Sequence, residues 1–580
     1  MPVPLVPKTL QRESLGGFRG VNLRQDRLSL ADEDVARAIN IDFHRHPGVA
    51  LLRLGSSTQF STSLGATIRR LARYNSVRYQ VAGTVLYANQ ASLLTGLHSD
   101  LFTTLQPLRP LNDTTEWVYI ADRSAMKKTN GTTVYNWGIT APSAAPTLGT
   151  TGTGLTGAYT AVYTYVRVVG SSVATESNPS PTPASQTLTN QNLTVAVTAS
   201  SDAQVTHIRI YRSVAGGAVH LYDQQVANTT ATITSSRADS ALGTAVATTN
   251  GVPATAAWVT AFQEHLFTCR DPSNPHYLWY SHRFREEMSA SNYLEIGNPS
   301  DPLQGAFPLA GFLGVFTRLT KYRVVGNATS GFVAQEALSS RGTPAAHAAC
   351  VTARGVVFPA RDGLYLTNFL QEDQELSQAI APLFHGETVN DYAPIDWSQA
   401  SRIACAEYKN RWYFSYPDTA GNQLVAVYSK DTQQWYFYDY GTDLRAFLVE
   451  EDLDDLVGGG SAGLAYVLEE PGVFSDRGGS VSVTLEPATR AGQDRFIRKL
   501  FQYLRADLDA QGGSVTLQVY VDDTLRATKT ITGRRTRALL RLPDRLLGST
   551  WRLKLTYTGT EEVAVHGLTM WYLPLEVVGA

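Results

Sequence analysis

Trp117-Val-Tyr-Ile-Ala-Asp-Arg-Ser-Ala-Met-Lys-Lys-Thr-Asn-Gly-Thr-Thr-Val-Tyr-Asn-Trp137 carries the pattern that decides the fold. Three short segments rich in Val, Tyr and Trp are separated by polar residues, which is typical of antiparallel strands. Asn130-Gly131 predicts a hairpin, because both central positions of a two-residue turn favour the left-handed backbone. The stretch therefore predicts strand, turn, strand and turn at short intervals, as in a blade of a β-propeller.

The same rhythm extends to both sides of this stretch. Arg78–Gly83 and Thr84–Asn89 predict another hairpin upstream, and the pattern resumes at Ala257 and continues to about Leu468. Helix signal is scarce: Leu30–Asn40 predicts one short helix, and Gln374–Leu383 a further turn. Many short strands with turn punctuation predict an all-β chain of sandwich, barrel or propeller type, and the blade-like rhythm favours the propeller.

A different strand pattern interrupts the blades. Ala141–Gly154 is rich in Pro, Gly and Thr and resembles a linker. Gly157–Val169 then alternates, with Tyr159, Tyr163 and Tyr165 on one face. The strands that follow predict one β-sandwich, inserted into the propeller or attached to it. A Tyr-x-Tyr-x-Val strand followed by Glu-Ser-x-Pro-Ser resembles fibronectin type III modules.

Beyond the blades, the alternation continues without the tryptophan-and-turn rhythm. Ser514–Asp523, Arg537–Leu542 and Trp551–Tyr557 predict a final sandwich. A chain of 580 residues predicts several domains, at ~100–200 residues each. We expect an N-terminal arm with a short helix at 1–50, a discontinuous β-propeller at 51–140 and 252–470, a fibronectin III-like sandwich at 141–251, and a C-terminal β-sandwich at 471–580.

Composition limits the function classes. The chain is 43% apolar and 17% charged with a net charge of −2, which argues against a dominant basic surface for gripping phosphates. Cys269, Cys350 and Cys405 have neither disulfide-framework nor metal-ligand spacing, so we expect a reducing compartment during assembly. The N-terminus lacks a secretory signal pattern. The longest apolar run, Phe307–Phe316, is shorter than the ~20 residues of a membrane span, so we expect a soluble chain.

A histidine pair and an acidic run are the candidate metal sites of the sequence. His44 and His46 form a His-x-His pair near Asp42, but no third zinc ligand is visible, which favours a structural or surface role. Glu450–Asp455 is the densest acidic run; it lacks the regular ligand spacing of a calcium loop. A channel lining that repels DNA remains an alternative to a solvated hairpin tip, which the charge pattern favours.

One glycine-rich motif is a candidate catalytic site, and two basic clusters are candidate anion sites. Gly459-Gly-Ser461-Ala-Gly463 matches the Gly-x-Ser-x-Gly nucleophile elbow, but a strand pattern rather than a helix follows, which favours a glycine-rich turn. Arg534–Arg537 and Arg490–Lys499 are basic clusters that face DNA, an acidic partner or solvent. We predict no catalytic residue, no cofactor and no metal, and therefore no enzyme.

A series of motifs along the chain resembles one protein family. A leader of the form Gly-Gly-x-x-x-x-Asn-x-Arg-x-Asp is followed by Ala-x-Asn-x-Asp and Arg53-Leu-Gly. The later motifs begin at Asn274, Leu313, Gly355, Asn410, Val427 and Gly458. From their residues alone, these segments are expected to determine the fold through their aromatic and turn residues, with Tyr428 and Trp435 as core anchors of one hairpin. In this order, the series resembles the β-propeller tail proteins of bacteriophages, above all the nozzle (tail tubular B-type) proteins.

The resemblance implies a structural virion protein rather than an enzyme. It implies a homo-hexameric ring around the DNA channel that retains the genome and guides its ejection, with genomic DNA passing through without sequence specificity. The implied partners are a tail adaptor or tubular protein and tail fibres, and the host envelope is a further candidate partner. The implied location is the virion tail, after assembly in the host cytoplasm.

The leader supplies the candidate interface residues. An arm without a core of its own is expected to be ordered by a neighbour, such as the next subunit of a ring. Packing on its own propeller is the alternative. The interface residues that we expect are Phe18, Asn22, Arg24, Asp26, Asn40 and Asp42.

Two other function classes remain open. A receptor- or carbohydrate-binding tail protein suits an aromatic-rich propeller. A propeller glycosidase is less favoured, because the nearest approach to an Asp-box, Ser429–Trp435, lacks its glycine and is one residue short.

Overall fold

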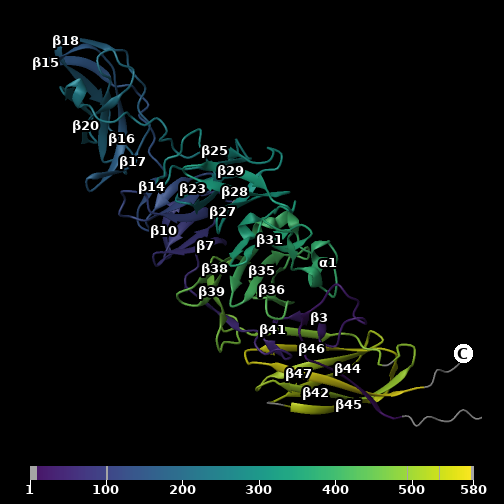
Figure 1. Cartoon of the computed structure of the whole chain (residues 1–580). Coiled ribbons are helices and arrows are strands. Elements are labelled where there is room, and N and C mark those ends of the chain that lie inside the picture. Colours follow the sequence, from purple (N-terminus) through teal and green to yellow (C-terminus); the bar gives the residue numbers. More distant parts are fainter. Residues whose placement is uncertain (1–8, 100–101, 493, 534–535, 576–580) are drawn as a thin grey trace, which may run out of the picture. The chain divides into compact units, whose positions relative to one another are not determined.

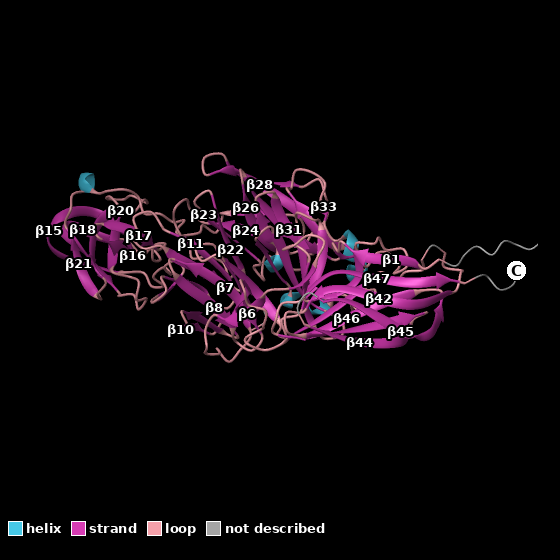
Figure 2. Ribbon diagram, turned by 90° about the horizontal axis from the view of Figure 1, so that it is seen from below, coloured by secondary structure: helices cyan, strands magenta, loops and turns pink. Residues whose placement is uncertain are grey.

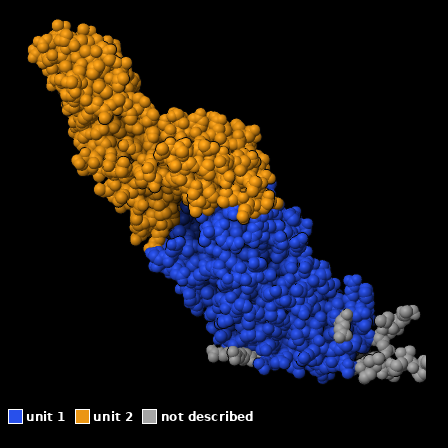
Figure 3. Space-filling model, in the orientation of Figure 1, with its two compact units in different colours: residues 1–71, 344–368, 373–580 blue, residues 72–343, 369–372 orange. Residues whose placement is uncertain are grey.

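The computed structural model describes residues 9–99, 102–492, 494–533 and 536–575. The chain divides into two compact units (Figure 3). Unit 1 comprises Met1–Leu71, Pro344–Asn368 and Asp373–Ala580, and unit 2 comprises Ala72–Thr343 and Phe369–Glu372. Strands dominate the described residues (Figure 2). The helical elements among them are α1 (Ala381–Phe384) and 3-10 turns at Asp239–Ala241, Ala346–Ala348, Gln378–Ile380 and Trp397–Arg402. The all-β prediction is confirmed.

Four antiparallel sheets lie in the described residues of unit 2, except that the first strand, β7 (Ile68–Tyr74), begins in unit 1. In each sheet, every strand pairs with the next one along the chain. Their strands are β7 (Ile68–Tyr74), β8 (Val77–Ala82), β9 (Val85–Ala88) and β10 (Ala91–Thr95); β11 (Thr104–Leu108), β12 (Trp117–Ala121), β13 (Met126–Thr129) and β14 (Val134–Asn136); β22 (Trp258–Phe262), β23 (His265–Cys269), β24 (Tyr277–Tyr280) and β25 (Tyr293–Glu295); and β26 (Leu303–Leu309), β27 (Phe312–Thr317), β28 (Lys321–Asn327) and β29 (Gly331–Glu336). Figure 1 labels several of these strands, among them β7, β10, β23 and β29. The meander predicted from Trp117–Trp137 is confirmed by β12, β13 and β14.

The hairpin predicted at Asn130-Gly131 is also confirmed, but its loop is longer than expected. Thr129 pairs with Val134, so the loop spans residues 130–133. Gly131 has a positive φ of 96°, and Asn130 does not have a positive φ. The side-chain Oδ1 of Asn130 instead accepts hydrogen bonds from the backbone N–H of Thr132 and Thr133, at 3.1 and 2.9 Å. An asparagine that closes a turn in this way removes the need for a second left-handed residue.

Consecutive sheets of unit 2 pack face to face. Val81 on β8 shares a hydrophobic cluster with Val118 on β12, and Tyr119 on β12 shares one with Leu266 on β23. Their periodicity puts alternate residues of each strand on the buried faces. The core of this unit is therefore a series of inter-sheet layers.

The tyrosine-rich segment forms a separate pair of sheets in unit 2. The sheets have the orders β15-β18-β21 and β17-β16-β19-β20. The strands are β15 (Thr147–Tyr159), β16 (Ala161–Val169), β17 (Ser172–Glu176), β18 (Gln186–Val197), β19 (His207–Arg212), β20 (Leu221–Ala227) and β21 (Ala231–Ser235). Tyr163 and Tyr165 share one cluster with Leu193 and Val195 of the opposite sheet. The predicted common tyrosine face is confirmed, whereas the expected linker at Ala141–Gly154 already contains the first half of β15.

Unit 1 continues the meander pattern. Its strands are β30 (Cys350–Thr352), β31 (Gly355–Ala360), β32 (Gly363–Thr367) and β33 (Gln374–Glu375); β34 (Ala404–Tyr408), β35 (Arg411–Pro417), β36 (Gln423–Ser429) and β37 (Gln434–Tyr438); and β38 (Leu444–Glu450), β39 (Asp455–Gly460) and β40 (Ala465–Glu470). The last sheet is completed by β6 (Gly55–Thr58), which pairs antiparallel with β40. A strand from the start of the chain thus fills the fourth position of the final sheet.

The C-terminal strands form two packed layers. They are β41 (Val481–Pro487), β42 (Lys499–Asp509), β43 (Ser514–Val521), β44 (Thr524–Thr532), β45 (Thr536–Gly548), β46 (Trp551–Gly559) and β47 (Ala564–Pro574). One layer has the order β41-β46-β43-β44 and the other contains β47-β42-β45. Leu504 and Met570 of one layer share a hydrophobic cluster with Leu517 and Leu553 of the other.

The N-terminal arm is built into these layers of its own chain. Its strands are β1 (Gln11–Gly16), β2 (Gly20–Val21), β3 (Asp34–Ile39), β4 (Ile41–Asp42) and β5 (Ala50–Leu52). Strands β1 and β5 pair with β47. Strands β2 and β3 lie between β37 and β41, which joins the β34–β37 meander and a C-terminal layer into one sheet of ten described strands.

The predicted helix at Leu30–Asn40 is wrong. Residues 34–39 form β3, because β37 and β2 offer parallel partners on one side and β41 an antiparallel partner on the other. Short segments have weak intrinsic helix stability, so hydrogen bonds to three neighbouring strands outweigh a local preference.

Candidate functional site

The six predicted interface residues are divided by burial. Phe18 and Asp42 are fully buried and Asn40 is 3% exposed. Asn22 is half-buried, and Arg24 and Asp26 are exposed. In this conformation, Arg24 and Asp26 are the members of the set that present their side chains to solvent.

The buried members hold the arm on its own chain. The Oδ1 of Asn40 accepts hydrogen bonds from Arg53 Nε and from the backbone N–H of Asp439, both at 2.8 Å, and its Nδ2 donates to the Ser482 carbonyl. Asn40 has a φ of 58°, a conformation that asparagine tolerates better than most residues. The Asp42 carboxylate lies 3.4 Å from the Arg411 guanidinium. These contacts give both side chains a structural role.

The other sequence motifs are also placed by the fold. His44 Nδ1 lies 2.9 Å from Ser429 Oγ, and His46 is exposed. Among the described residues, no group of His, Cys, Asp and Glu side chains is arranged to hold a metal ion. The acidic run lies at the β38–β39 hairpin, with exposed residues 451–454, so the hairpin-tip interpretation is confirmed.

The glycine run is a strand and a turn. Gly458–Gly460 lie in β39, and the chain enters β40 after Gly463, whose φ is 76°. A Cβ on Gly459 would lie 2.7 Å from the side chain of Ile68, so the close approach requires glycine. No helix follows in this described segment, which excludes the nucleophile elbow. Residues 534 and 535 of one basic cluster and 493 of the other lie outside the described residues.

A buried ion pair joins β13 to the segment between β24 and β25, and a hydrogen bond from β17 reaches the same carboxylate. Lys128 Nζ lies 2.6 Å from Glu286 Oε1, and both side chains are 0% exposed. Tyr119 and Thr175 donate hydroxyl hydrogen bonds to the same carboxylate, at 2.8 and 2.9 Å. Lys128 and Tyr119 are opposite each other in the β12–β13 register, whereas Thr175 lies on β17. We call Lys128, Glu286, Tyr119 and Thr175 the junction cluster.

Glu287 extends this cluster with a second carboxyl group. Its Oε1 accepts a hydrogen bond from the backbone N–H of Glu176 at 3.1 Å, while its buried Oε2 has no partner among the described residues. Burial, followed by the charge of Glu286, raises the pKa of Glu287 to about 7. The folded protein therefore binds a proton at Glu287 in a pH range where the unfolded chain does not.

We expect unfolding of unit 2 to be pH-dependent through Glu287. Because its folded pKa is raised, the stability that its proton contributes is present below pH 4.5 and is lost as pH rises from about 4.5 to about 7, by on the order of 3 kcal/mol. Urea unfolding of wild type and Glu287→Gln at pH 5, 6, 7 and 8 tests this. Gln should flatten the decline and stabilise the protein at pH 8.

The matched control for this measurement is Glu336→Gln, which changes an exposed carboxylate in the same unit. Its pH profile should follow the wild type. Equal slopes for wild type and Glu287→Gln would contradict the assignment.

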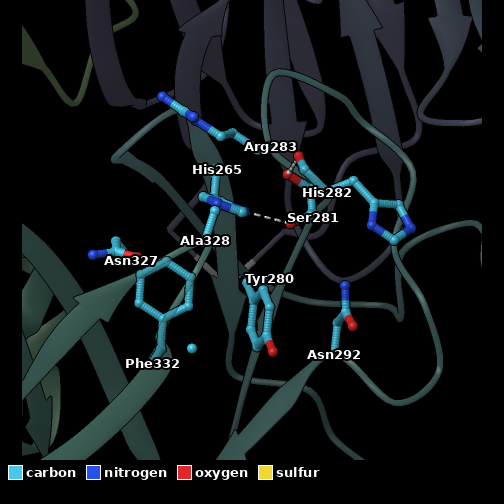
Figure 4. A pocket seen from close by; sticks show the side chains of 10 residues that line it. His265, Tyr280, Ser281, His282, Arg283, Asn292, Asn327, Ala328 and Phe332 are labelled. Atoms are coloured by element: carbon cyan, nitrogen blue, oxygen red, sulfur yellow. Dashed lines mark hydrogen bonds between the residues drawn. The ribbon is translucent and has the colours of Figure 1, made fainter.

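A pocket of about 330 Å³ opens between β23, β24, β28 and β29 (Figure 4). It is lined by His265, Tyr280, Ser281, His282, Arg283, Asn292, Asn327, Ala328, Gly331 and Phe332. The volume is at the lower end of the range for small-ligand sites. The pocket combines aromatic rings with several polar groups, and it is a candidate binding site in the described part of unit 2.

His265 is the most constrained polar group in this pocket. It is 4% exposed, and its ring packs edge-on against Phe332 with centroids 5.2 Å apart. Burial lowers the pKa of His265, so the imidazole is neutral near pH 7. Its Nδ1 donates to the Ser281 carbonyl at 2.7 Å, which leaves Nε2 as an acceptor. Nε2 has no hydrogen-bond partner among the described residues.

Sequence reasoning did not identify the pocket or the junction cluster. Lys128 and His265 lie in segments for which the sequence predicted only blade-like strands. The signal that could have been used is a charged residue opposite an aromatic one on an inward face: Lys128 opposite Tyr119. Adjacent Glu286 and Glu287 were a further signal.

Comparisons with known proteins do not identify a family. No protein-family model matches the chain, and no curated protein matches it. Among solved structures, the computationally designed protein Ika8 is 9% identical, with 72% of this chain and 99% of that chain covered and a TM-score of 0.33. YCF48 from Cyanidioschyzon merolae is 8% identical, covering 71% and 98%, with a TM-score of 0.24.

An exo-beta-1,3-galactanase from Phanerochaete chrysosporium is 7% identical, covering 56% and 96%, with a TM-score of 0.22. At TM-scores this low, none of these likenesses carries an argument. Within the described residues, no helix has the length and apolar character needed to cross a bilayer.

Proposed function

We propose that the chain is a structural protein of a bacteriophage tail, of the nozzle or tail-hub type. The observation that carries the proposal is the order of the sheets. Seven four-stranded meanders follow one another among the described strands, and β6 from the start of the chain completes the last one. Consecutive sheets with the final sheet filled by an N-terminal strand are the topology expected of a β-propeller.

The motifs that resemble tail proteins lie on the strands of successive sheets. The segments that begin at Asn274, Leu313, Gly355, Asn410, Val427 and Gly458 contribute to β24, β27–β28, β31–β32, β35, β36–β37 and β39–β40. Tyr428 and Trp435 are register partners with rings 5.1 Å apart, as the hairpin motif requires. The proposal further includes that strands β15–β21 form a fibronectin III-like domain. Their division into a three-stranded and a four-stranded sheet is that of seven-stranded sandwiches.

In the proposed assembly, identical copies close into a ring by cyclic symmetry. Six copies surround a DNA channel, and neighbours include a tail adaptor and tail fibres. Because β1 and β2 are built into unit 1, the contact that we propose with a neighbour is made by the exposed turn around Arg24 and Asp26. The protein acts in the virion tail, without catalysis or a cofactor.

The experiment is native mass spectrometry of the protein alone and with the tail proteins encoded beside its gene. We expect a monomer alone and a six-fold ring with a neighbour. The double charge reversal Arg24→Glu/Asp26→Arg should weaken ring formation by about tenfold or more, as loss of two charged contacts would. Arg354→Glu, an exposed charge elsewhere in unit 1, is the control.

Two outcomes would count against this proposal in different ways. A wild-type protein that stays monomeric with every tail protein would refute the tail assignment. A double reversal that assembles like the wild type would refute the arm contact.

The alternative of a receptor- or carbohydrate-binding tail protein is favoured by one observation, the pocket at His265. A glycosidase needs two carboxyl groups at its site. Of the described residues that line this pocket, none is Asp or Glu. The pocket therefore favours binding over turnover.

A further inference from the structure

The pocket between β23, β24, β28 and β29 contains a buried acceptor that the fold leaves unused. The His265 imidazole packs edge-on against the rings of Tyr280 and Phe332, at centroid distances of 6.1 and 5.2 Å, and its Nε2 has no hydrogen-bond partner among the described residues. A buried polar atom without a hydrogen-bond partner destabilises the folded protein. A ligand that donates a hydroxyl or amide hydrogen here removes that destabilisation.

Amides and a phenol hydroxyl supply further uncharged polar groups in the pocket (Figure 4). Asn292 is half-buried, and its side-chain amide makes no hydrogen bond within the described residues. The Asn327 Oδ1 accepts from the N–H of Thr329 and Ser330, which directs its Nδ2 to other acceptors. Together with the Tyr280 hydroxyl, these groups can both donate to and accept from a ligand that carries several hydroxyls.

The positive charge of Arg283 does not favour a charged ligand in the pocket. Arg283 Nε donates to the Glu264 carboxylate at 3.1 Å, and both side chains are about half exposed, so the guanidinium is already paired and solvated. His282 Nε2 lies 2.9 Å from the Thr249 carbonyl. The ligand chemistry is therefore neutral, with several hydroxyl groups and an apolar face to lie against Tyr280 and Phe332.

We propose that this pocket binds one neutral pyranose unit, with a sugar hydroxyl donating to His265 Nε2 and a second hydrogen-bonded to the Asn292 amide. The apolar C–H face of the sugar packs against the aromatic rings, and the volume of about 330 Å³ accommodates a single unit rather than a long chain. The inference goes beyond the proposed tail function and does not depend on it.

The test uses the full-length protein and four probes: the methyl glycosides of glucose, galactose, mannose and N-acetylglucosamine. Saturation-transfer NMR detects contact, and titration calorimetry measures affinity. We expect saturable binding of at least one probe with a Kd of about 0.1–10 mM, since a single small site captures limited free energy. Asn292→Ala and His265→Phe should each weaken it by about tenfold.

His265→Phe keeps a ring in the aromatic cluster but removes the acceptor, and Asn292→Ala covers the case in which the first variant does not fold. His46→Phe, a change at an exposed histidine, is the matched control and should bind like the wild type. The proposal is overturned if no probe binds saturably, or if binding is unchanged in every folded variant at the pocket. Neither result bears on ring assembly, so the two proposals fail separately.

Discussion

Lys128→Met should lower the free energy of unfolding of unit 2 by about 3–5 kcal/mol, because it leaves the Glu286 carboxylate buried without its cation. Both side chains of the pair are 0% exposed, and Tyr119 and Thr175 supply neutral hydrogen bonds that cannot replace a full charge. Hydrogen exchange measured by mass spectrometry, on peptides that cover β12, β13 and β17, reports the change. Exchange in all three strands should accelerate together, since the junction cluster joins them.

The double variant Lys128→Met/Glu286→Gln separates charge from packing. With both charges removed, no unpaired charge is left buried, so the double variant should regain much of the free energy of unfolding that Lys128→Met loses. Lys127→Met is the control: this neighbour on the same strand donates from the surface to Asn136, and its loss should change stability by within about 0.5 kcal/mol. A double variant as unstable as Lys128→Met would show that the charge pair is not the cause.

Arg53→Met should have an effect of similar size in unit 1, about 3–5 kcal/mol. Arg53 is fully buried, and its guanidinium donates to Asn40 Oδ1 and to the Asp439 carbonyl at 2.8 Å each, and to the Asp476 carboxylate at 3.0 Å. It also lies 4.0 Å from the centroid of the Tyr440 ring. Without Arg53, the Asp476 carboxylate has lost this cationic partner, and the segment that leads into β6 has lost its hydrogen bonds to Asn40 and Asp439.

Arg53→Lys should retain little of this stability, because an ammonium cannot reproduce the planar fork of donors. Hydrogen exchange at β6 and β40 is the readout. Arg19→Met, which breaks an exposed pair with Glu33 on the same arm, should cost less than about 1 kcal/mol. Unchanged protection of β6 in Arg53→Met would contradict the role given to this side chain.

The strands could be predicted because the residue patterns that indicate them lie within the strands and the adjoining turns. Alternation and turn residues located β12–β14 and the β36–β37 hairpin, and Tyr428 and Trp435 were identified as anchors from their spacing. The β3 segment was mispredicted because its local sequence suits a helix, while its partners β37 and β41 lie far along the chain. Non-local pairing decided that element.

The candidate sites were not predictable for the same reason. Lys128 and Glu286 are 158 residues apart, and nothing near either one indicates the other. The surroundings of the unpartnered His265 nitrogen depend on the rings of Tyr280 and Phe332 and on the Ser281 carbonyl, which come together only in the folded unit. By contrast, the acidic hairpin tip and the glycine-rich turn needed only neighbouring residues, and both predictions were confirmed.

The pairing of β1 with β47 sets the order of events during synthesis. Ser14 and Thr569, which are hydrogen-bonded across these strands, are 555 positions apart. At about 5–20 residues per second, the ribosome exposes the arm for roughly half a minute to two minutes before its partner strand exists. Throughout that time Phe18, Val21 and Leu23 lack the core that buries them. The nascent arm is therefore a natural substrate for chaperones, and the sheet that contains β1 and β47 closes last.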